Sequence, residues 1–401
     1  MKITRKKLNK NDLDLVILAG GKGTRINKFL GNLPKPMVKF NKKFFLQYII
    51  QNFSKYPFKK IYILTGYRAI KIHKFFNNKL YNLTPIECIK EKKLMGTGGA
   101  LIGLKNKIKK HFILINGDTI FDINPFDLIK ICKSKLIGSM SLVNNKQQKS
   151  KKLNLLSLTK HTMSFTKKGK FMNGGVYYFK KAIFKFLKKK NHSLENEIIP
   201  KLIIQNKING KSFNRFFLDI GTPKHYFAAS KRLLKNFKKP AVFLDRDGVI
   251  NHDTGYVSNL KDFVFRDNVI EGLNYLIKKG YYIFVVTNQA GIGKAYFKLQ
   301  DFLNMQKQVQ IFLSQNHIYL NEIKYSPYHP NAKIKKYRRN SNYRKPGNMM
   351  IQDLFHDWDL DTKKSFMIGD KITDYFAAKK SDLQFYYAEE DFLKQIKKIL
   401  N

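Results

Sequence analysis

The chain has 401 residues, 43% of them hydrophobic, and no apolar run of the roughly 20 residues that span a bilayer, so we expect neither a membrane protein nor one small domain. The basic start precedes no apolar stretch of a signal peptide, and Cys88 and Cys132 are too few for a disulfide framework, so we expect a cytoplasmic protein. The net charge of +49 could indicate nucleic acid or an anionic membrane as partner, but the lysines are scattered through every segment, so we expect neither and only a field that favours phosphate-rich substrates.

Short apolar runs alternate with amphipathic stretches of helical length along the chain. The runs expected to form buried strands are 13–19, 61–65, 111–115, 241–244, 281–287 and 365–368. This alternation is typical of parallel α/β sheets, which bind ligands at the carboxyl ends of their strands. A Lys-rich helical stretch ends at Pro240, where a new strand begins. The sequence therefore predicts an α/β protein with two domains, 1–236 and 237–401, each a mainly parallel sheet flanked by helices.

The first predicted strand runs into a glycine loop, LAGGKGTRI, at residues 18–26. The loop contains Gly20, Gly21, Gly23 and Thr24. Its glycines would let backbone N–H groups approach a triphosphate closely, although a turn of this kind can also be purely structural. Arg25 and Lys35 add cations that could neutralise a nucleotide undergoing phosphoryl transfer.

Two aspartates follow apolar stretches later in the first half, Asp118 in NGDT and Asp219 in FLDIGTP. Carboxylates at strand ends, together with phosphate oxygens, are ligands that Mg²⁺ prefers. Either aspartate alone could equally cap a helix. The pair is therefore a candidate magnesium site.

Motifs in a recognisable order give residues 12 to about 236 a resemblance to the sugar-1-phosphate nucleotidyltransferases. They are LAGGKGTRI, the Pro-Lys-Pro around Lys35, MGTGGAL at 95–101, NGDT, NGGVYYF at 173–179, SLENEIIP at 193–200 and FLDIGTP. The C-terminal β-helix common in that family is absent here. The resemblance implies a Rossmann-like nucleotidyltransferase fold.

The same resemblance assigns roles to these motifs. The implied nucleotide contacts are Gly20, Gly21, Gly23, Thr24, Arg25, Gly98 and Gly99, and the implied sugar contacts are Asn173, Gly174 and Glu195. Lys35 would steady the α-phosphate, and Asp118 and Asp219 would bind Mg²⁺. The phosphate of a sugar 1-phosphate would then attack the α-phosphorus in line and release pyrophosphate, so catalysis would depend on positioning and charge neutralisation.

The second half opens with AVFLDRDGVIN, which places Asp245 and Asp247 two residues apart at the expected end of a strand. Strand alternation would direct both side chains to one face, where like charges repel. The pair therefore indicates a bound cation such as Mg²⁺, or catalysis. Without further motifs, the same residues could lie in a solvated loop.

From about residue 241 onward, the chain resembles the haloacid-dehalogenase-type (HAD) phosphatases, and within them those for heptose bisphosphate and histidinol phosphate. The motifs are DRDGVIN, GYV at 255–257, VVTNQAGIGKAYF at 285–297, RKPGNMM at 344–350 and MIGDKITD at 367–374. The resemblance implies a HAD-like Rossmannoid fold. It also implies that Asp245 attacks phosphorus to form an aspartyl-phosphate, while Asp247 acts as acid and base.

Further roles follow from this resemblance. The residues implied to contact the substrate are Thr287, Asn288, Arg344 and Lys371. Lys345 would neutralise the phosphoryl oxygens. Asp370 would bind Mg²⁺ with Asp245 and Asp247, the latter through its backbone carbonyl.

One departure concerns a zinc loop that this branch usually carries before the Arg-Lys-Pro. Its Cys-x-His and Cys-x-Cys positions hold Ser326, Tyr328, Ser341 and Tyr343 here. No soft ligand remains, so we expect no zinc, and we interpret His329 as a surface residue. The loss leaves the sugar and anomer preference open. The nearby Lys333, Lys335, Lys336, Arg338 and Arg339 are interpreted as a solvated basic run, with a second substrate phosphate as the alternative.

The two resemblances are chemically compatible, because heptose 1-phosphate, the implied phosphatase product, is a suitable transferase substrate. We expect removal of the 7-phosphate of D-glycero-D-manno-heptose 1,7-bisphosphate and then guanylyl transfer from GTP; GTP rests on resemblance alone. One alternative pairs mannose or glucose 1-phosphate with a phosphatase for another phosphomonoester, such as histidinol phosphate. Another is a basic nucleic-acid-binding protein with relic enzyme domains, against which the intact aspartates argue. The oligomeric state stays open.

Overall fold

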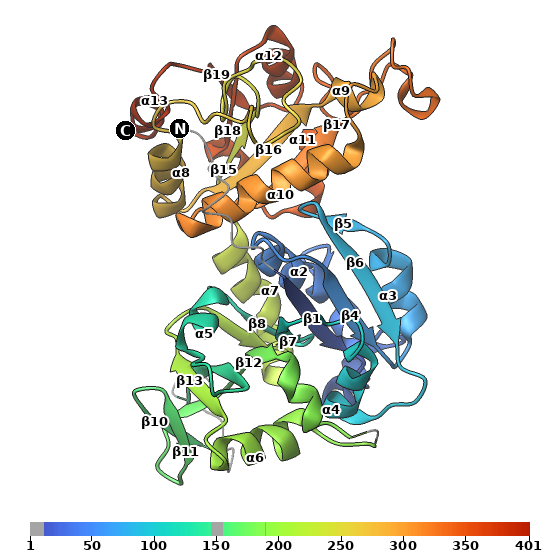
Figure 1. Cartoon of the computed structure of the whole chain (residues 1–401), viewed down its shortest axis with the longest axis vertical. Coiled ribbons are helices and arrows are strands. Elements are labelled where there is room, and N and C mark those ends of the chain that lie inside the picture. The colour runs from blue at the N-terminus through green and yellow to red at the C-terminus, as the bar shows by residue number, and fades with distance from the viewer. Residues whose placement is uncertain (1–11, 146–154, 189) are drawn as a thin grey trace. The chain divides into compact units, whose positions relative to one another are not determined.

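The computed structural model describes residues 12–145, 155–188 and 190–401 (Figure 1). The expectation that no signal peptide is present concerns the first eleven residues, which lie outside this part. The described chain forms two compact units, residues 12–52 with 58–232 and residues 53–57 with 233–401. The change between them falls within helix α7 (Pro223–Phe237). The domain limits 1–236 and 237–401 stay a prediction.

The N-terminal unit is built on a ten-stranded mixed sheet whose centre is parallel. Its parallel core has the order β6 (Thr84–Lys90), β4 (Ile61–Thr65), β1 (Leu13–Ala19) and β7 (His111–Asn116). Antiparallel to β7 lies β12 (Phe171–Lys180), which continues to β9 (Gly138–Asn144), β10 (Leu156–Thr159) and β11 (Thr162–Phe165), with β13 (Ile208–Ser212) parallel to β9. Helices of this unit include α2 (Phe45–Ser54), α3 (Ala69–Phe76), α4 (Gly96–Leu101), α5 (Phe126–Ile131) and α6 (Ile199–Ile204).

The C-terminal unit contains a five-stranded sheet in which every pair is parallel. Its order is β17 (Glu322–Ser326), β16 (Tyr282–Asn288), β15 (Ala241–Leu244), β18 (Phe366–Gly369) and β19 (Gln384–Tyr387). The helices are α8 (Val269–Lys278), α9 (Ala290–Gly293), α10 (Leu299–Gln315), α11 (Met349–Asp357), α12 (Ile372–Lys379) and α13 (Phe392–Leu400). The predicted α/β class is confirmed for both halves.

The predicted strands are confirmed with small changes at their ends. Three match their predicted ranges, 13–19, 61–65 and 241–244, while 111–115 extends by one residue. The other two, predicted at 281–287 and 365–368, are each shifted by one residue toward the C-terminus. Because β15 ends at Leu244, Asp245 and Asp247 lie in the following loop. Strand alternation therefore does not orient their side chains, and the loop does.

Each sheet contains a pair of adjacent parallel strands from which the chain continues in opposite directions along the sheet. These are β1 beside β7 in the first sheet and β15 beside β18 in the second. A crevice opens at the carboxyl ends of such a strand pair and commonly holds the ligand. The glycine loop follows β1 and Asp118 follows β7, whereas Asp245 follows β15 and Asp370 follows β18. Topology therefore brings the separate motifs of each half to one edge.

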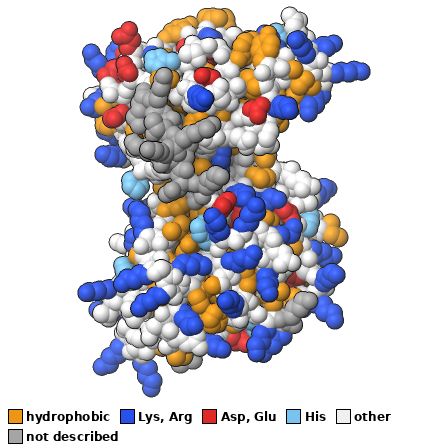
Figure 2. Space-filling model, in the orientation of Figure 1, with side chains coloured by type: hydrophobic (Ala, Val, Ile, Leu, Met, Phe, Trp, Pro, Cys, Tyr) orange, Lys and Arg blue, Asp and Glu red, His pale blue; other side chains and the backbone are white. Residues whose placement is uncertain are grey.

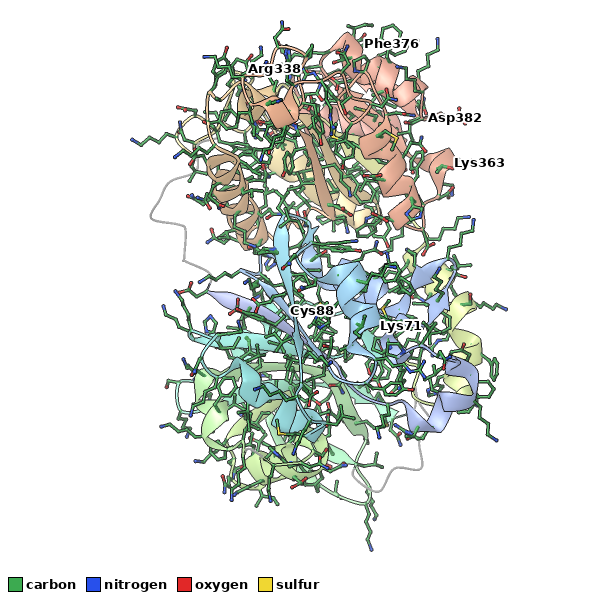
Figure 3. All side chains as sticks on the ribbon, turned by 90° about the vertical axis from the view of Figure 1, so that its right-hand side faces the viewer. Lys71, Cys88, Arg338, Lys363, Phe376 and Asp382 are labelled. Atoms are coloured by element: carbon green, nitrogen blue, oxygen red, sulfur yellow. The ribbon has the colours of Figure 1, made fainter. Side chains whose placement is uncertain are left out.

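The surface shows how the large positive charge is distributed. Lys and Arg side chains lie scattered among hydrophobic and uncharged ones on the face drawn in Figure 2, without forming one continuous patch. None of the described helices is both long and apolar enough to cross a membrane. Cys88, labelled in Figure 3, is buried, and it and Cys132 are both free thiols.

The buried Asp14 should make the stability of the protein depend on pH. Burial raises the pKa of Asp14 in β1 to about 6, against the opposing charge of Lys59. Between about pH 4 and pH 6 the unfolded chain loses a proton that the folded chain retains, so wild-type stability falls as the pH rises through this window. The free energy of unfolding of Asp14→Asn, relative to that of wild type, should therefore rise by on the order of 2 kcal/mol between pH 4 and pH 8, as measured by urea unfolding.

Asp12→Asn provides the matched control for this comparison. Burial at Asp12 is outweighed by Lys59 and Lys110, which hold the pKa of its carboxyl below the usual value. Its replacement should therefore show no such gain as the pH rises. An Asp14→Asn difference that is the same at both pH values would contradict the prediction.

Candidate active sites

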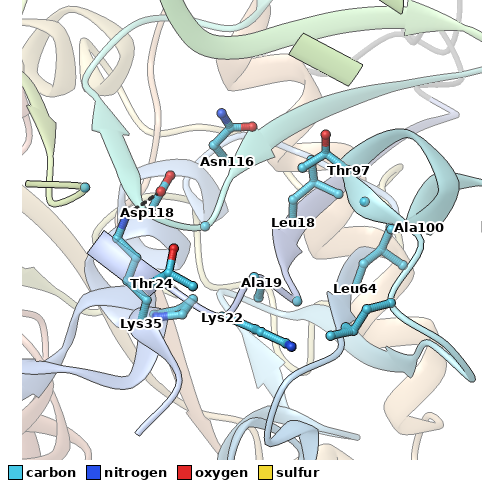
Figure 4. A pocket seen from close by; sticks show the side chains of 18 of the residues that line it. Leu18, Ala19, Lys22, Thr24, Lys35, Leu64, Thr97, Ala100, Asn116 and Asp118 are labelled. Carbon is cyan, nitrogen blue, oxygen red and sulfur yellow. Dashed lines mark hydrogen bonds and ion pairs between the residues drawn. The ribbon is translucent and has the colours of Figure 1, made fainter. Parts of the chain in front are cut away.

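A cavity of about 540 Å³ lies at the carboxyl ends of β1 and β7 (Figure 4). Predicted site residues in its lining are Gly20, Gly21, Gly23, Thr24, Arg25, Lys35, Asp118, Glu195 and Asp219. The lining also includes residues to which the motifs assign no role, among them Lys22, Glu91, Leu94, Thr97 and Asn116. The cavity thus combines a glycine loop, cations and carboxylates, the groups that hold a nucleotide and its metal ion.

Lys35 and Asp118 form the charged centre of this cavity. A short 3₁₀ turn, Lys35–Met37, holds the buried lysine so that its Nζ lies 2.5 Å from Asp118 Oδ2 (Figure 4). Burial would raise the pKa of Asp118, but the charge of Lys35 outweighs it and keeps the pKa below the usual value. The aspartate is therefore ionised at neutral pH and available to a cation.

Asp219 is brought beside Asp118 by a two-stranded ribbon. Strand β14 (Phe217–Asp219) pairs antiparallel with β8 (Thr119–Phe121), and Ile220 donates its N–H to the Asp118 carbonyl at 3.1 Å. Gly221 leaves room for the charged groups, because a Cβ there would lie 2.6 Å from Asp219 Oδ1 and 3.3 Å from Lys35 Nζ.

Glu195 is held at another wall of the cavity by Thr97. It lies in a π-helical turn, Leu194–Ile198, a conformation often associated with functional sites. Thr97 Oγ1 donates to Glu195 Oε2 at 2.5 Å and accepts the N–H of Leu194 at 2.9 Å. The sequence does not single out Thr97, because it stands among the glycines of GTGGAL, which themselves indicate a nucleotide contact.

Four predicted contacts are not among the described residues that line this cavity: Gly98, Gly99, Asn173 and Gly174. A Cβ at Gly98 would meet the ring of His192 at 2.6 Å, so close packing requires glycine there. Asn173 accepts the N–H of Gly175 at 2.9 Å and donates to the Tyr177 hydroxyl at 2.6 Å. The substrate contacts assigned to these four residues stay predictions.

The C-terminal unit gathers three carboxylates at the ends of β15 and β18. One oxygen each from Asp245, Asp370 and Asp374 lie within 4.8 Å of one another. Lys345 Nζ lies 2.9 Å from Asp245 Oδ1 and 2.5 Å from Asp374 Oδ1. Burial raises the pKa of Asp245; burial would lower that of Lys345, but the two carboxylates raise it. The lysine therefore stays charged beside the carboxylates.

Asp374 was not assigned from the sequence, although it ends the MIGDKITD motif. It is fully buried, and its Oδ2 accepts the N–H of Lys371 at 3.0 Å. Near it, Gly248 has a φ of +85°, and a side chain there would collide with Asp370. The Asp247 carboxylate does not join the acidic cluster, and the ligand role predicted for Asp247 is through its carbonyl.

The remaining predicted residues surround this cluster. Asn288 and Lys345 exchange hydrogen bonds of 3.0 Å between the asparagine amide and the lysine backbone, which fixes the lysine in place. Thr287 is buried and accepts a hydrogen bond from Gln289 at 2.9 Å. Lys371 is exposed and pairs with Asp253 at 2.8 Å.

Arg344 and the neighbouring Lys345 both line a cavity of about 410 Å³, together with Lys380. Burial lowers the pKa of the Arg344 guanidinium, and Tyr256 opposes this change. The substrate contact predicted for Arg344 stays a prediction.

Aromatic and basic side chains occupy the segment that would carry zinc ligands. The Arg339 guanidinium lies 4.3 Å from the centre of the Tyr328 ring, and Tyr337 packs edge-on against the same ring. Arg338, labelled in Figure 3, donates from Nε to the Ala332 carbonyl at 2.6 Å. His329 is half-buried and accepts the N–H of Asn331 at Nδ1. The five basic residues of the segment are exposed.

The fold and the two sites define a class. Each unit is an α/β fold with parallel strands at the centre of its sheet, and each places a buried lysine against aspartate at the carboxyl ends of those strands, an arrangement suited to phosphoryl transfer. Comparison with known proteins makes the class specific. A family model described as nucleotidyl transferase matches residues 15–236, and one described as polynucleotide kinase 3 phosphatase matches residues 240–397.

Similar curated proteins match the C-terminal part. The D-glycero-beta-D-manno-heptose-1,7-bisphosphate 7-phosphatase of Photorhabdus laumondii is 43% identical over 139 residues, which are 35% of this chain and 74% of that protein. The enzyme of the same name from Rhodopseudomonas palustris is 33% identical, over 40% of this chain and 91% of that protein. The chain therefore belongs to the nucleotidyl transferase family through its first half and to the family of the heptose-bisphosphate phosphatases through its second.

Two solved structures are similar to one half each. HddC from Yersinia pseudotuberculosis, complexed with GMP-PN, is 27% identical and matches 55% of this chain and 99% of its own, with a TM-score of 0.47. A HAD-like phosphatase from Mesorhizobium loti is 27% identical and matches 40% of this chain and 88% of its own, with a TM-score of 0.38.

Proposed function

We propose that the chain is a bifunctional enzyme of nucleotide-sugar synthesis. Domain 237–401 removes the 7-phosphate of D-glycero-D-manno-heptose 1,7-bisphosphate, and domain 1–236 transfers GMP from GTP to the resulting heptose 1-phosphate, releasing pyrophosphate and GDP-heptose. The observation that carries this proposal is the fusion: relatives named for that bisphosphate match the second half, and the first half is a nucleotidyl transferase. The product of one reaction is then the acceptor of the other. Since both use phosphorylated metabolites, we place the enzyme in the cytoplasm.

In the phosphatase half, Asp245 attacks the phosphorus, and the bond from phosphorus to the sugar oxygen breaks. Asp247 gives its proton to that leaving oxygen and later takes one from the water that cleaves the aspartyl-phosphate. Lys345 neutralises the phosphoryl oxygens, with Thr287 and Asn288 as hydrogen-bond donors to them.

The acidic cluster fits Mg²⁺. Oxygens of Asp245, Asp370 and Asp374 converge within 4.8 Å, and Asp370 Oδ1 is buried without a hydrogen-bond partner in the described part of the chain. Hard oxygen ligands of this kind suit Mg²⁺, which would supply positive charge to the phosphate when bound. Asp247 would contribute its backbone carbonyl. Arg344 and Lys371 face the substrate or support the site.

In the transferase half, the glycine loop and Arg25 bind the nucleotide phosphates, and Lys35 steadies the α-phosphate. Asp118 and Asp219 would hold a second Mg²⁺, whose charge would offset that of the triphosphate. The paired Lys35 and Asp118 place a cation and a metal ligand within 2.5 Å of each other. Glu195, Asn173 and Gly174 serve the sugar.

GTP as the nucleotide is supported by the chemistry of Glu91. This half-buried carboxylate lines the cavity close to Gly20, at the first glycine of the loop. It accepts one hydrogen bond, 3.3 Å from the Met95 N–H, among the described residues. Burial raises its pKa, so additional donors would favour the ionised form. Guanine offers two adjacent donors, N1–H and the 2-amino group, which match the two oxygens of a carboxylate.

Replacing Glu91 with Gln tests this assignment. Wild type should use GTP better than ITP, which lacks the 2-amino group, by roughly 10- to 100-fold in kcat/KM, because a hydrogen bond to a charged group is worth about 1.5–3 kcal/mol. Glu91→Gln should reduce that ratio toward one, as measured by pyrophosphate release. The exposed Glu197→Gln provides the control and should keep the ratio. An unchanged ratio in Glu91→Gln would remove the base contact from the proposal.

The decisive experiment for the function uses the purified full-length chain. Incubated with heptose 1,7-bisphosphate, GTP and Mg²⁺, it should release phosphate, pyrophosphate and GDP-heptose. If neither step occurs in a folded protein, the substrate assignment fails. Mannose 1-phosphate, glucose 1-phosphate and histidinol phosphate then test the alternative sugars and phosphomonoesters. Salt-sensitive DNA binding without any turnover would instead favour the nucleic-acid alternative.

A further inference from the structure

The Asp247 carboxylate is surrounded by N–H donors from three residues. Arg246 reaches Oδ1 from Nε at 3.0 Å, and its Nη2 lies 2.8 Å from both Oδ1 and Oδ2. Asn251 donates to Oδ1 at 3.0 Å, and Gln289 donates to Oδ2 at 2.9 Å. A carboxylate on a loop can otherwise rotate freely about its side-chain bonds. These contacts fix both the position and the plane of the group.

Each of the three donors is itself anchored. Arg246 is buried, donates to the Val257 carbonyl at 3.0 Å and stacks 5.5 Å from the centre of the Phe302 ring. Asn251 has no exposed surface and also donates to the His252 carbonyl at 2.9 Å. These three donor side chains therefore form a rigid support, called here the Asp247 clamp: Arg246, Asn251 and Gln289.

Gln289 also relates Asp247 to the phosphate site. Its Nε2 donates to both Asp247 Oδ2 and Thr287 Oγ1, each at 2.9 Å. Oδ2 therefore lies on the side of Thr287, a residue assigned above to the phosphoryl oxygens. Oδ1 accepts three of these hydrogen bonds and Oδ2 two, so Oδ2 is the less heavily hydrogen-bonded of the two oxygens as well as the one nearer the phosphate site.

We propose that the Asp247 clamp positions the general acid of the phosphatase and that Asp247 Oδ2 is the oxygen that carries the transferred proton. The inference rests on the proposed phosphatase function. In the first step, the Oδ2–H bond breaks as the proton passes to the sugar oxygen, whose bond to phosphorus breaks while Asp245 bonds to phosphorus. Arg246, Asn251 and Gln289 are positioning residues, since they act through Asp247. Accurate placement of such an acid is needed for efficient proton transfer.

Leaving groups of different basicity separate this role from a structural one. A sugar alkoxide needs a proton as it departs, whereas p-nitrophenolate is stable without one. The quantity to compare is kcat/KM, because it covers the steps up to departure of the leaving group and excludes the later attack of water. The substrates are heptose 1,7-bisphosphate and p-nitrophenyl phosphate, both with the full-length chain and Mg²⁺.

Gln289→Met is the main variant, because methionine has a similar length and no donor. We expect kcat/KM for the bisphosphate to fall by at least roughly 10-fold and that for p-nitrophenyl phosphate to change by less than about 3-fold. Asp247→Asn should show the same selectivity with a larger loss. Arg246→Lys keeps the charge but cannot bind both oxygens, so it should lie between wild type and Asp247→Asn. Gln300→Met, at an exposed glutamine of α10, should match wild type.

The outcomes separate the clamp from its alternatives. Gln289 also contacts Thr287, so damage to phosphate binding or to the fold would lower kcat/KM equally for both substrates. An equal loss on both substrates, or no loss on either, overturns the inference. Nucleotidyl transfer and the unfolding midpoint show whether a variant is folded. If Arg246→Lys does not fold, the result for Gln289→Met alone tests the inference. A wild-type chain that hydrolyses neither substrate overturns the phosphatase assignment itself and the inference with it.

Discussion

Asp245→Asn is expected to lower phosphate release by more than about 10³-fold while leaving nucleotidyl transfer unchanged. An amide is not a nucleophile toward phosphorus, so the covalent route closes. Lys345 still has Asp374 at 2.5 Å, so the buried lysine keeps one carboxylate and the unit should remain folded. Release of phosphate from the bisphosphate, and of pyrophosphate from GTP with heptose 1-phosphate supplied, measures the two steps separately.

Asp382→Asn is the matched control for that variant. Asp382 lies at the surface of the C-terminal unit, as labelled in Figure 3, and has a φ of +54°, a conformation that asparagine also adopts readily. It should keep both activities. Substantial phosphatase activity in Asp245→Asn would remove the nucleophile role, and a parallel loss of nucleotidyl transfer would show that the two halves are not chemically independent.

Asp118→Asn is expected to lower pyrophosphate release by roughly 10²-fold or more, with phosphate release unchanged. The change removes one proposed metal ligand and leaves Lys35, buried in the cavity wall, without its charged partner at 2.5 Å. Both effects weaken the charge balance around the triphosphate. The measurement is the initial rate of pyrophosphate formation at saturating Mg²⁺.

Asp127→Asn serves as its control in the same unit. Its carboxylate is partly exposed and pairs with Lys211 at 3.1 Å and Lys130 at 3.7 Å, contacts that are worth little at a surface. It should transfer nucleotide at the wild-type rate. A rate within a few-fold of wild type in Asp118→Asn would contradict the metal role.

The sequence by itself determined the strands and the order of the motifs. Runs such as Leu13–Ala19 and Ala241–Leu244 are apolar because both faces of a parallel sheet are covered, a constraint that each segment carries locally. The motifs also identified Lys35 in its Pro-Lys-Pro, Asp118 after an apolar run and Lys345 in its Arg-Lys-Pro. These residues could be named in advance because their signals lie within a few neighbouring positions.

The tertiary structure decided which of these residues meet. Asp374 joins Asp245 and Lys345 only because β15 and β18 are adjacent, and Thr97 reaches Glu195 across 98 positions of sequence. The same holds for the close packing of Gly98 against the ring of His192. Contacts of this kind depend on strand order and side-chain packing, which are set by burial over the whole sheet. No local pattern of residues specifies them.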